Sequence, residues 1–380
     1  MDSSAQPDWE NPHNLLQILQ YLPGMSIAAF QRLRHSLGDL TDLWQQPVRE
    51  VQALLPSKTR RHYAELRSDP QSTEAVTQWQ LDQMSLQRQG VETISWHDQR
   101  YPPLLKEIHQ PPPVLYVLGD PDCLSDPQLA LVGSRNMTPN GSENAYRFAH
   151  YLAQAGLVVT SGLATGVDAQ AHRGALQAEG KTVAVMATGI DRLYPPRHQA
   201  LADDIVRMGG CLVTEFRPGT PPLPRHFPTR NRIVSGLSLG VLVVEAATKS
   251  GSLITARLAM EQNREVFAIP GSIHNPQARG CHQLIRQGAT LVESGLDIAE
   301  QLQGWVRSSE PTISSSLHEV DNADLEVAEQ QLLQWIGYDF MTLDQLGETS
   351  GWSTEKLLSK LMSLQLKGIV VQQGAGYQRL

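Results

Sequence analysis

Short apolar segments alternate with glycine turns and amphipathic segments through the middle of the chain. The apolar segments are residues 129–132, 157–160, 182–187, 211–214, 241–245 and 266–269, with 289–292 as a further candidate. The amphipathic segments include residues 141–155, 168–179 and 252–262. Short all-apolar strands connected by helices form parallel sheets that are covered on both faces. This pattern predicts an α/β core with a doubly wound, Rossmann-like parallel sheet, whose ligand binds at the carboxyl ends of the strands.

The segment before this core has a different pattern. Residues 91–95 are predicted to form a strand, and Pro111, Pro112 and Pro113 fix an extended approach to residues 114–117. Because proline donates no hydrogen bond to a sheet, we expect residues 114–117 to form the entry to the sheet rather than its centre.

The chain is long enough, at 380 residues, for two or three domains. Residues 1–75 contain short helices broken by glycine turns, which resembles a sterile-alpha-motif or helix-hairpin-helix bundle. Its Pro-Gly turn carries no Lys or Arg, so we interpret the bundle as structural rather than DNA-binding. The core is predicted to span residues 76–306 and a Ser-rich linker residues 307–322. Residues 323–380 have the pattern of three helices and a β-hairpin, which resembles a winged helix.

Charge is distributed unevenly along the chain. The whole chain has a net charge of −8, whereas residues 130–305 hold 16 Lys and Arg against 13 Asp and Glu, a net of +3. A positive segment in an acidic protein is the natural candidate for binding phosphates.

Several classes of protein are excluded or disfavoured by the sequence. No segment approaches the roughly 18 consecutive apolar residues of a membrane span, and residues 1–12 show no export signal. Cys123, Cys211 and Cys281 lie far apart and have neither metal-ligand spacing nor a disulfide pattern. We therefore expect a cytoplasmic protein with structural thiols, no metal site and no membrane partner.

A basic window lies within the core, because residues 216–244 contain no Asp or Glu. Its arginines are Arg217, Arg225, Arg230 and Arg232. An aromatic residue, Phe227, lies among them. This combination is typical of sites that stack the bases of single-stranded nucleic acid and bind its phosphates. Arg217 is the weaker candidate, because Glu215 is close enough in sequence to pair with it.

Glycine turns follow several of the predicted strands. The three that matter here are Gly133-Ser134-Arg135, the turn around Gly162, and Ser250-Gly251-Ser252. Exposed N–H groups and the helix dipole favour a bound anion at such turns. A single glycine turn between a strand and a helix is also common for steric reasons alone, because glycine tolerates backbone conformations that other residues avoid. Three of them in one sheet, together with the basic window, predict a phosphate-binding site. Neither a phosphate-loop NTPase motif nor a dinucleotide fingerprint is present, so we expect no cofactor.

Two positions invite a catalytic interpretation. Asp168 and His172 are four residues apart and share a helix face, but a helix acid beside a hydrogen-bonded histidine is the commoner explanation. Glu245 ends an apolar strand and is expected to order the neighbouring loops. No nucleophile-elbow motif is present. We therefore predict no catalytic residue.

Taken together, these motifs resemble the DNA-processing protein A family (DprA, also called Smf). The resemblance spans about residues 130–295 and rests on segments 132–135, 161–172, 189–191 with 194–195, 227–238, 244–246 with 250–256, and 269–271. Residues 100–105 and 112–116 are similar to the lead-in of that family. The resemblance implies an extended Rossmann-like core that forms a homodimer and binds single-stranded DNA. It also implies a non-enzymatic protein that protects incoming strands and loads the RecA recombinase during natural transformation, with DNA repair as a further setting.

The resemblance assigns roles to individual residues. The residues that it implies as DNA contacts are Gly133, Ser134, Arg135, Gly162, Arg225, Phe227, Arg230, Asn231, Arg232, Ser250, Gly251 and Ser252. Phe227 stacks on a base in this scheme, and the arginines, glycine turns and hydroxyls hold phosphates. We expect Arg135→Ala and Arg230→Ala each to lose most of the affinity while leaving the fold intact.

Two alternatives stay open. Winged helices often bind DNA, but residues 323–380 have a net charge of −3, so a protein-interaction or dimer-regulating module is favoured. The core also resembles the Lonely Guy (LOG) nucleoside-monophosphate phosphoribohydrolases, in which Glu245 would be the acid. Their Pro-Gly-Gly-x-Gly-Thr signature is absent here, with Ser250-Gly251-Ser252 in its place. Turnover of AMP to adenine and ribose phosphate distinguishes the enzyme from the DNA-binding protein.

Overall fold

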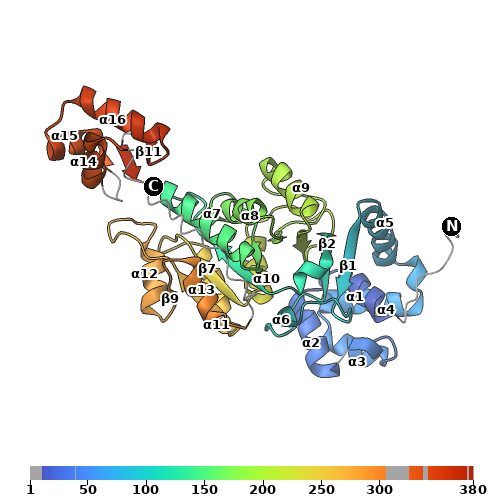
Figure 1. The fold of residues 1–380 in the computed structure, drawn as a ribbon. Helices are drawn as coiled ribbons and strands as arrows, with labels where there is room; N and C mark the ends of the chain where they lie inside the picture. Colours follow the sequence, from blue (N-terminus) through green and yellow to red (C-terminus); the bar gives the residue numbers. More distant parts are fainter. Residues whose placement is uncertain (1–10, 39, 305–324, 337–340, 375, 380) are drawn as a thin grey trace.

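The computed structural model describes residues 11–38, 40–304, 325–336, 341–374 and 376–379 (Figure 1). The predicted linker, residues 307–322, lies outside the described residues. Within them, the strands form one nine-stranded sheet and one three-stranded sheet.

The nine-stranded sheet forms the centre of the core. Its strands are β1 (Val91–Ser95), β2 (Val114–Gly119), β3 (Gln128–Val132), β4 (Val158–Ser161), β5 (Thr182–Val185), β6 (Cys211–Thr214), β7 (Gly240–Val243), β8 (Glu265–Ala268) and β9 (Thr290–Leu291). They lie in the order β1-β2-β6-β5-β4-β3-β7-β8-β9, and neighbours from β6 to β9 are parallel. This arrangement confirms the doubly wound topology. Because the strand order reverses at β3 and β7, the ligand crevice is expected at their carboxyl ends.

The prediction for residues 114–117 is wrong in one respect. Strand β2 lies inside the sheet, where it pairs antiparallel with β1 on one side and β6 on the other. Its fully buried Tyr116 faces Thr93 in β1 and Thr214 in β6. The prolines end before the strand begins at Val114, so they remove no hydrogen bond from the sheet.

Helices cover both faces of the nine-stranded sheet. They are α6 (Pro103–Lys106), α7 (Pro139–Gln154), α8 (Val167–Gln177), α9 (Gln199–Arg207), α10 (His226–Leu237), α11 (Ser252–Glu261), α12 (Arg279–Arg286) and α13 (Gly295–Gln301). Successive residues of a strand point to opposite faces. In β3, Leu129 therefore packs in the cluster that includes α7, α8 and α13, whereas Ala130 packs with α10, α11 and α12. The basic window thus contains a helix, α10, and Pro228 occupies its first turn, where the missing N–H is tolerated.

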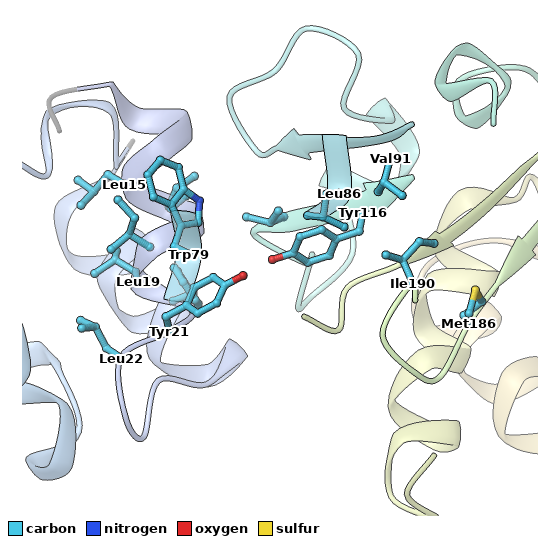
Figure 2. Close-up of a cluster of buried hydrophobic side chains, with 14 of the residues drawn as sticks. Leu15, Leu19, Tyr21, Leu22, Trp79, Leu86, Val91, Tyr116, Met186 and Ile190 are labelled. Atoms are coloured by element: carbon cyan, nitrogen blue, oxygen red, sulfur yellow. The ribbon is translucent and has the colours of Figure 1, made fainter. Parts of the chain in front are cut away.

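The first domain is a helical bundle, as the sequence predicts. Its helices are α1 (Pro12–Leu19), α2 (Ile27–Leu37), α3 (Val48–Leu54), α4 (Ser57–Ser68) and α5 (Glu74–Arg88). Its apolar core continues into the large sheet, because Trp79 of α5 lies in one buried cluster with Tyr116 and Ile190 (Figure 2). The guanidinium of Arg217 also lies over the ring of Tyr21, 4.6 Å from its centroid. The bundle therefore shares a core with the sheet, and the boundary between these two domains stays a prediction.

The last domain has the winged-helix fold that the sequence predicts. Its elements are α14 (Val327–Ile336), β10 (Met341–Thr342), α15 (Leu343–Ser350), α16 (Thr354–Leu366), β11 (Val370–Gln373) and β12 (Gly376–Arg379). Strand β12 lies between β10 and β11 in the three-stranded sheet. The sequence pattern missed β10, which is only two residues long.

A buried carboxylate paired with a partly exposed lysine makes the stability of this domain dependent on pH. The carboxylate of Glu329 accepts hydrogen bonds from Lys367 Nζ (2.7 Å) and Ser363 Oγ (2.6 Å), and its side chain is 2% exposed. Burial raises the pKa of this carboxyl, but the hydrogen bonds from Lys367 and Ser363 outweigh burial and lower the pKa from 4.5 to about 2. The unfolded chain has the ordinary pKa. The carboxylate therefore stabilises the domain above about pH 4.5, and up to about 3 kcal/mol is lost as the pH falls towards 2.

Thermal unfolding of the full chain, followed by tryptophan fluorescence between about pH 5 and about pH 2.5, measures this loss. The rings of Trp335 and Trp352 lie 5.0 Å apart within the same domain. Glu329→Gln has no proton to gain, so we expect it to be less stable near neutral pH and to lose less stability on acidification. The same pH dependence in both proteins would contradict the assignment.

The remaining sequence predictions concern membranes, metals and thiols. In the described ranges, no helix combines the length and the apolar character that a membrane span requires. In the same ranges, no three His, Cys, Asp or Glu side chains gather as metal ligands would. All three cysteines are free and buried. The Sγ atoms of Cys123 and Cys211 lie 3.3 Å apart, and burial raises the pKa of the Cys211 thiol, which makes it a poor nucleophile.

Candidate functional site

A cleft of about 770 Å³ lies at the carboxyl ends of the central strands. Three turns line it: Gly133-Ser134-Arg135 after β3, the turn with Gly162 after β4, and Ser250-Gly251-Ser252 before α11. The cleft therefore lies at the crevice that the strand order predicts. The fold brings the three turns, which are far apart in sequence, to one cavity.

The N-terminus of α11 forms one wall of the cleft. Gly251 precedes the helix, and the first N–H groups make long hydrogen bonds, from Ser252 to the Ser250 hydroxyl (3.3 Å) and from Leu253 to the Ser250 carbonyl oxygen (3.2 Å). Ser250 and Ser252 add two hydroxyl groups, whose oxygens lie 2.7 Å apart. The positive end of the helix dipole and the two hydroxyl donors together favour a bound anion. Asn231 of α10 lies beside this wall, with its amide nitrogen 3.5 Å from the carbonyl oxygen of Gly251.

A cation and two aromatic rings also meet in the lining of the cleft. Arg135 is exposed, and its guanidinium lies 5.2 Å from the centroid of the Phe227 ring. The ring of Tyr194 meets Phe227 at 67°, with the centroids 5.7 Å apart. An exposed guanidinium held over an aromatic face is available to a phosphate, and the rings beside it are available to a base.

Arg230 lies beneath this surface rather than on it. Its side chain lines the cleft but is buried, and Nη1 donates a hydrogen bond to the carbonyl oxygen of Val185 (2.7 Å). Burial lowers the pKa of Arg230, and the nearby carboxylate of Asp168 opposes that shift. Burial raises the pKa of Asp168 in turn, against the attraction of Arg230 and an N–H from Ala164. Arg230 and Asp168 thus form a buried pair of opposite charges under the cleft.

Gly162 is required by this buried arginine. A Cβ atom at this position would lie 1.8 Å from Arg230 Nη1. The glycine therefore has a packing reason that the sequence alone could not reveal. The structure also changes the expectation for Arg230→Ala, because this substitution removes the stronger of the two positive neighbours, Arg230 and Arg135, of the buried Asp168 carboxyl.

Two of the predicted contacts lie outside the cleft. The guanidinium of Arg232 donates two hydrogen bonds to the Glu215 carboxylate (2.7 and 2.5 Å) and one to the carbonyl oxygen of Gln110 (2.9 Å). The side chains of Arg232 and Glu215 are 9% and 4% exposed, so the pair is buried. The sequence had suggested that Glu215 pairs with Arg217. In the structure Glu215 pairs with Arg232 instead. Arg225 is exposed just before α10 and does not line the cleft.

The acidic candidates for catalysis are held in structural contacts. Glu245 accepts hydrogen bonds from the backbone N–H (2.9 Å) and the hydroxyl (2.5 Å) of Thr138, the residue that caps α7. It lines a separate cavity of about 650 Å³ rather than the cleft. His172 is fully buried, bonded through Nδ1 to the Thr182 hydroxyl (2.7 Å), and burial lowers its pKa to about 3. These contacts match the loop-ordering roles that the sequence favours.

Comparison with known proteins identifies the family. Residues 92–303, more than half of the chain, match the family model "DNA recombination-mediator protein A". The chain belongs to this family. Residues 318–376 match the DprA winged helix domain.

Members of the DprA family are similar over most of the chain. Protein Smf of Escherichia coli is 42% identical over 280 residues, which cover 74% of this chain and 75% of that protein. DNA processing protein DprA of Streptococcus pneumoniae is 43% identical over 227 residues, or 59% of this chain and 80% of that protein.

Two solved structures of the family have the same fold. The X-ray structure of DprA from S. pneumoniae matches with a TM-score of 0.64 at 34% identity, over 77% of this chain and 98% of that chain. A structure of DprA from Helicobacter pylori, described by its single-stranded DNA binding mode, matches with a TM-score of 0.51 at 28% identity, over 56% of this chain and 95% of that chain.

The cleft at the ends of the central strands also contains residues that the sequence analysis did not predict as DNA contacts. Lys249 lines it directly before the Ser250 turn, and Asn136 lines it directly after Arg135. Each is adjacent to a glycine turn that the sequence analysis identified. Their place beside these turns could therefore have predicted that they line the cleft. Tyr194 had no such signal beyond its place in the family resemblance, because its contact with Phe227 joins two loops far apart in the chain.

Proposed function

We propose that this protein is a cytoplasmic recombination mediator whose cleft binds single-stranded DNA. The observation that supports this most strongly is the exposed guanidinium of Arg135 over Phe227, in one cleft with the N-terminus of α11 and its two serine hydroxyls. The Phe227 ring suits a base, whereas the Arg135 guanidinium and the N-terminus of α11 suit phosphates. The single-stranded DNA binding of the H. pylori relative supports the same function.

In the proposed complex each part of the cleft has a separate task. Arg135 and the turn after β3 bind one phosphate, and the Ser250 turn binds a neighbouring one. Phe227 stacks on the base between them. The buried pair of Arg230 and Asp168 holds the floor of the cleft in shape. A base can stack on Phe227 only when it is unpaired, so we expect single strands to bind more tightly than duplex.

Fluorescence anisotropy tests this function with a labelled 30–60-nucleotide strand, alone and annealed to its complement, without any nucleotide cofactor. We expect sequence-tolerant binding of the single strand and at least about tenfold weaker binding of the duplex. Equal affinity for both, or tighter binding of the duplex, would refute the proposal.

The proposal extends to assembly and to RecA. We propose that the protein forms a homodimer through its core and loads RecA on the bound strand, during natural transformation and DNA repair. The family name of the matching model, a recombination mediator, supports this role. Strand exchange by RecA on single strands already covered by a single-strand-binding protein tests it, with light scattering for the dimer. A protein that binds DNA but leaves strand exchange unchanged would not be a mediator.

We propose that the winged-helix domain contacts protein rather than DNA. Each of the three lysines on or just after α16 already has an intramolecular partner: Lys356 lies over the Trp352 ring, Lys360 pairs with Glu326, and Lys367 pairs with Glu329. A DNA phosphate must displace these partners. We therefore expect Lys356→Ala to leave the affinity for DNA unchanged in the anisotropy assay.

We also propose that the protein is not an enzyme. Glu245, the acid of the alternative LOG-like reaction, is occupied by Thr138 and lines a different cavity from the cleft. Incubation with AMP should therefore release no adenine, and release that Glu245→Gln abolishes would establish the enzyme instead.

A further inference from the structure

A second cavity opens beside the proposed DNA-binding cleft. Its volume is about 430 Å³, and Phe227 is among the residues that line it. Arg135, Gly162, Ala164, Tyr194 and Phe227 line both cavities. The two aromatic residues and Arg135 therefore form a partition between two adjoining spaces. No role for the second space follows from the binding of one base on Phe227.

We propose that this second cavity is a nucleotide subsite in which Tyr194 stacks on the base that follows the one on Phe227, and Arg197 binds the adjoining phosphate. The subsite rests on the proposed binding of single-stranded DNA. It adds a second base and a third phosphate to the contacts of the cleft.

The walls of the cavity have the chemistry that one nucleotide needs. Tyr194 is 44% exposed, so its ring is accessible to a ligand. Ala164 and Ala187 form small apolar surfaces, and Thr165 and Thr188 add hydroxyl groups. The volume lies within the range of pockets that hold small organic molecules, roughly 300–1,000 Å³.

Arg197 supplies the charge at the outer rim. It is exposed and lies in the short 3₁₀ helix Pro196–His198. Within the part of the chain that the structure describes, no carboxylate forms an ion pair with it. The neighbouring His198 is buried, and its Nδ1 lies 2.9 Å from the carbonyl oxygen of Leu163. This contact anchors the loop, so Tyr194 and Arg197 are presented on a fixed support rather than on a free loop.

The edge-to-face contact of Tyr194 with Phe227 suits two successive bases. The rings are inclined by 67° and both line both cavities, so a base stacked on one ring leaves the face of the other ring open to a second base. A strand that crosses the partition can place one base on each ring while Arg135, which lines both cavities, contacts the phosphate between them. Base stacking on an aromatic ring depends little on sequence, so the subsite should raise affinity without specificity.

Binding by Tyr194→Ala, Tyr194→Phe and Arg197→Ala tests the subsite, with a 30-nucleotide strand and with an abasic strand of the same length. We expect Tyr194→Ala to weaken binding of the normal strand about tenfold and Tyr194→Phe to restore it to within about twofold. On the abasic strand Tyr194→Ala should bind like the wild-type protein. Arg197→Ala should weaken binding of both strands by about the same factor and reduce the salt dependence.

The abasic strand separates stacking from a merely structural role. If Tyr194 only supported Phe227 and Arg135, its loss would also weaken binding of the abasic strand, because Arg135 contacts phosphate. That result would overturn the proposed subsite. Tight binding by the wild-type protein together with unchanged binding by Tyr194→Ala would also overturn it, while leaving the proposed function intact. If the wild-type protein fails to bind the normal strand, the proposed function fails first.

Discussion

Replacement of Arg135 by alanine should reduce the affinity for single-stranded DNA about 10- to 100-fold. The substitution removes a charge-assisted contact with a phosphate, worth roughly 1.5–3 kcal/mol, and the cation over the Phe227 ring. Arg135 is exposed. Its loss should therefore leave the unfolding temperature within about 1–2 °C of the wild-type value, since surface substitutions usually change stability by less than about 0.5 kcal/mol. Anisotropy titrations and thermal unfolding of the same preparations measure both quantities.

Arg207→Ala is the matched control for charge. Arg207 lies on α9, where it pairs with Asp204, and it does not line the cleft. Both variants remove one positive charge, so a general electrostatic effect would weaken binding equally. Arg135→Lys keeps the charge but loses the planar guanidinium, and we expect it to recover only part of the affinity. If Arg135→Ala binds like Arg207→Ala, the phosphate site is in the wrong place.

Replacement of Glu215 by glutamine should destabilise the protein by about 3–5 kcal/mol while the folded protein keeps its affinity for DNA. This substitution leaves the buried guanidinium of Arg232 without its negative partner, which is the costly way to break a buried ion pair. The cleft is unaffected, because neither residue lines it. Chemical denaturation gives the change in the free energy of unfolding, and titration at low temperature gives the affinity of the folded fraction.

The double variant Glu215→Leu with Arg232→Met provides the control. Replacing both charges by apolar side chains of similar size is often close to neutral, so much of the lost stability should return. Its affinity for DNA should equal that of the wild-type protein. A stable double variant that binds DNA at least tenfold more weakly would show that Arg232 contacts the strand and that our placement of the site is incomplete.

The sequence predicted the core of the fold because its signal is local. Strands β1 and β6 have the predicted bounds, Val91–Ser95 and Cys211–Thr214, because each is a short run of strand-favouring residues that directly follows a glycine. The place of β2 inside the sheet could not be predicted, since it depends on which distant strands pair with it. Strand β10 was missed because two residues carry no periodicity.

The site was predictable in its turns and less so in its arginines. Arg135 follows a glycine turn and Arg230 and Arg232 lie in the basic window, and both contexts indicated a phosphate contact. What separates them is burial and a partner, and Glu215 and Asp168 come from other parts of the chain. The sequence therefore located the cleft but could not tell which guanidinium faces the ligand and which ones hold the fold together.

The most direct test of the central claim is the salt dependence of single-strand binding by the wild-type protein and Arg135→Ala. Phosphate contacts release counterions, so the logarithm of the association constant should fall linearly with the logarithm of the salt concentration. We predict a steep negative slope for the wild-type protein and a slope smaller by about 0.7 for Arg135→Ala, the value for one lost phosphate on a single strand. No binding at low salt, or the same slope in both proteins, would contradict a cleft in which Arg135 holds the DNA backbone.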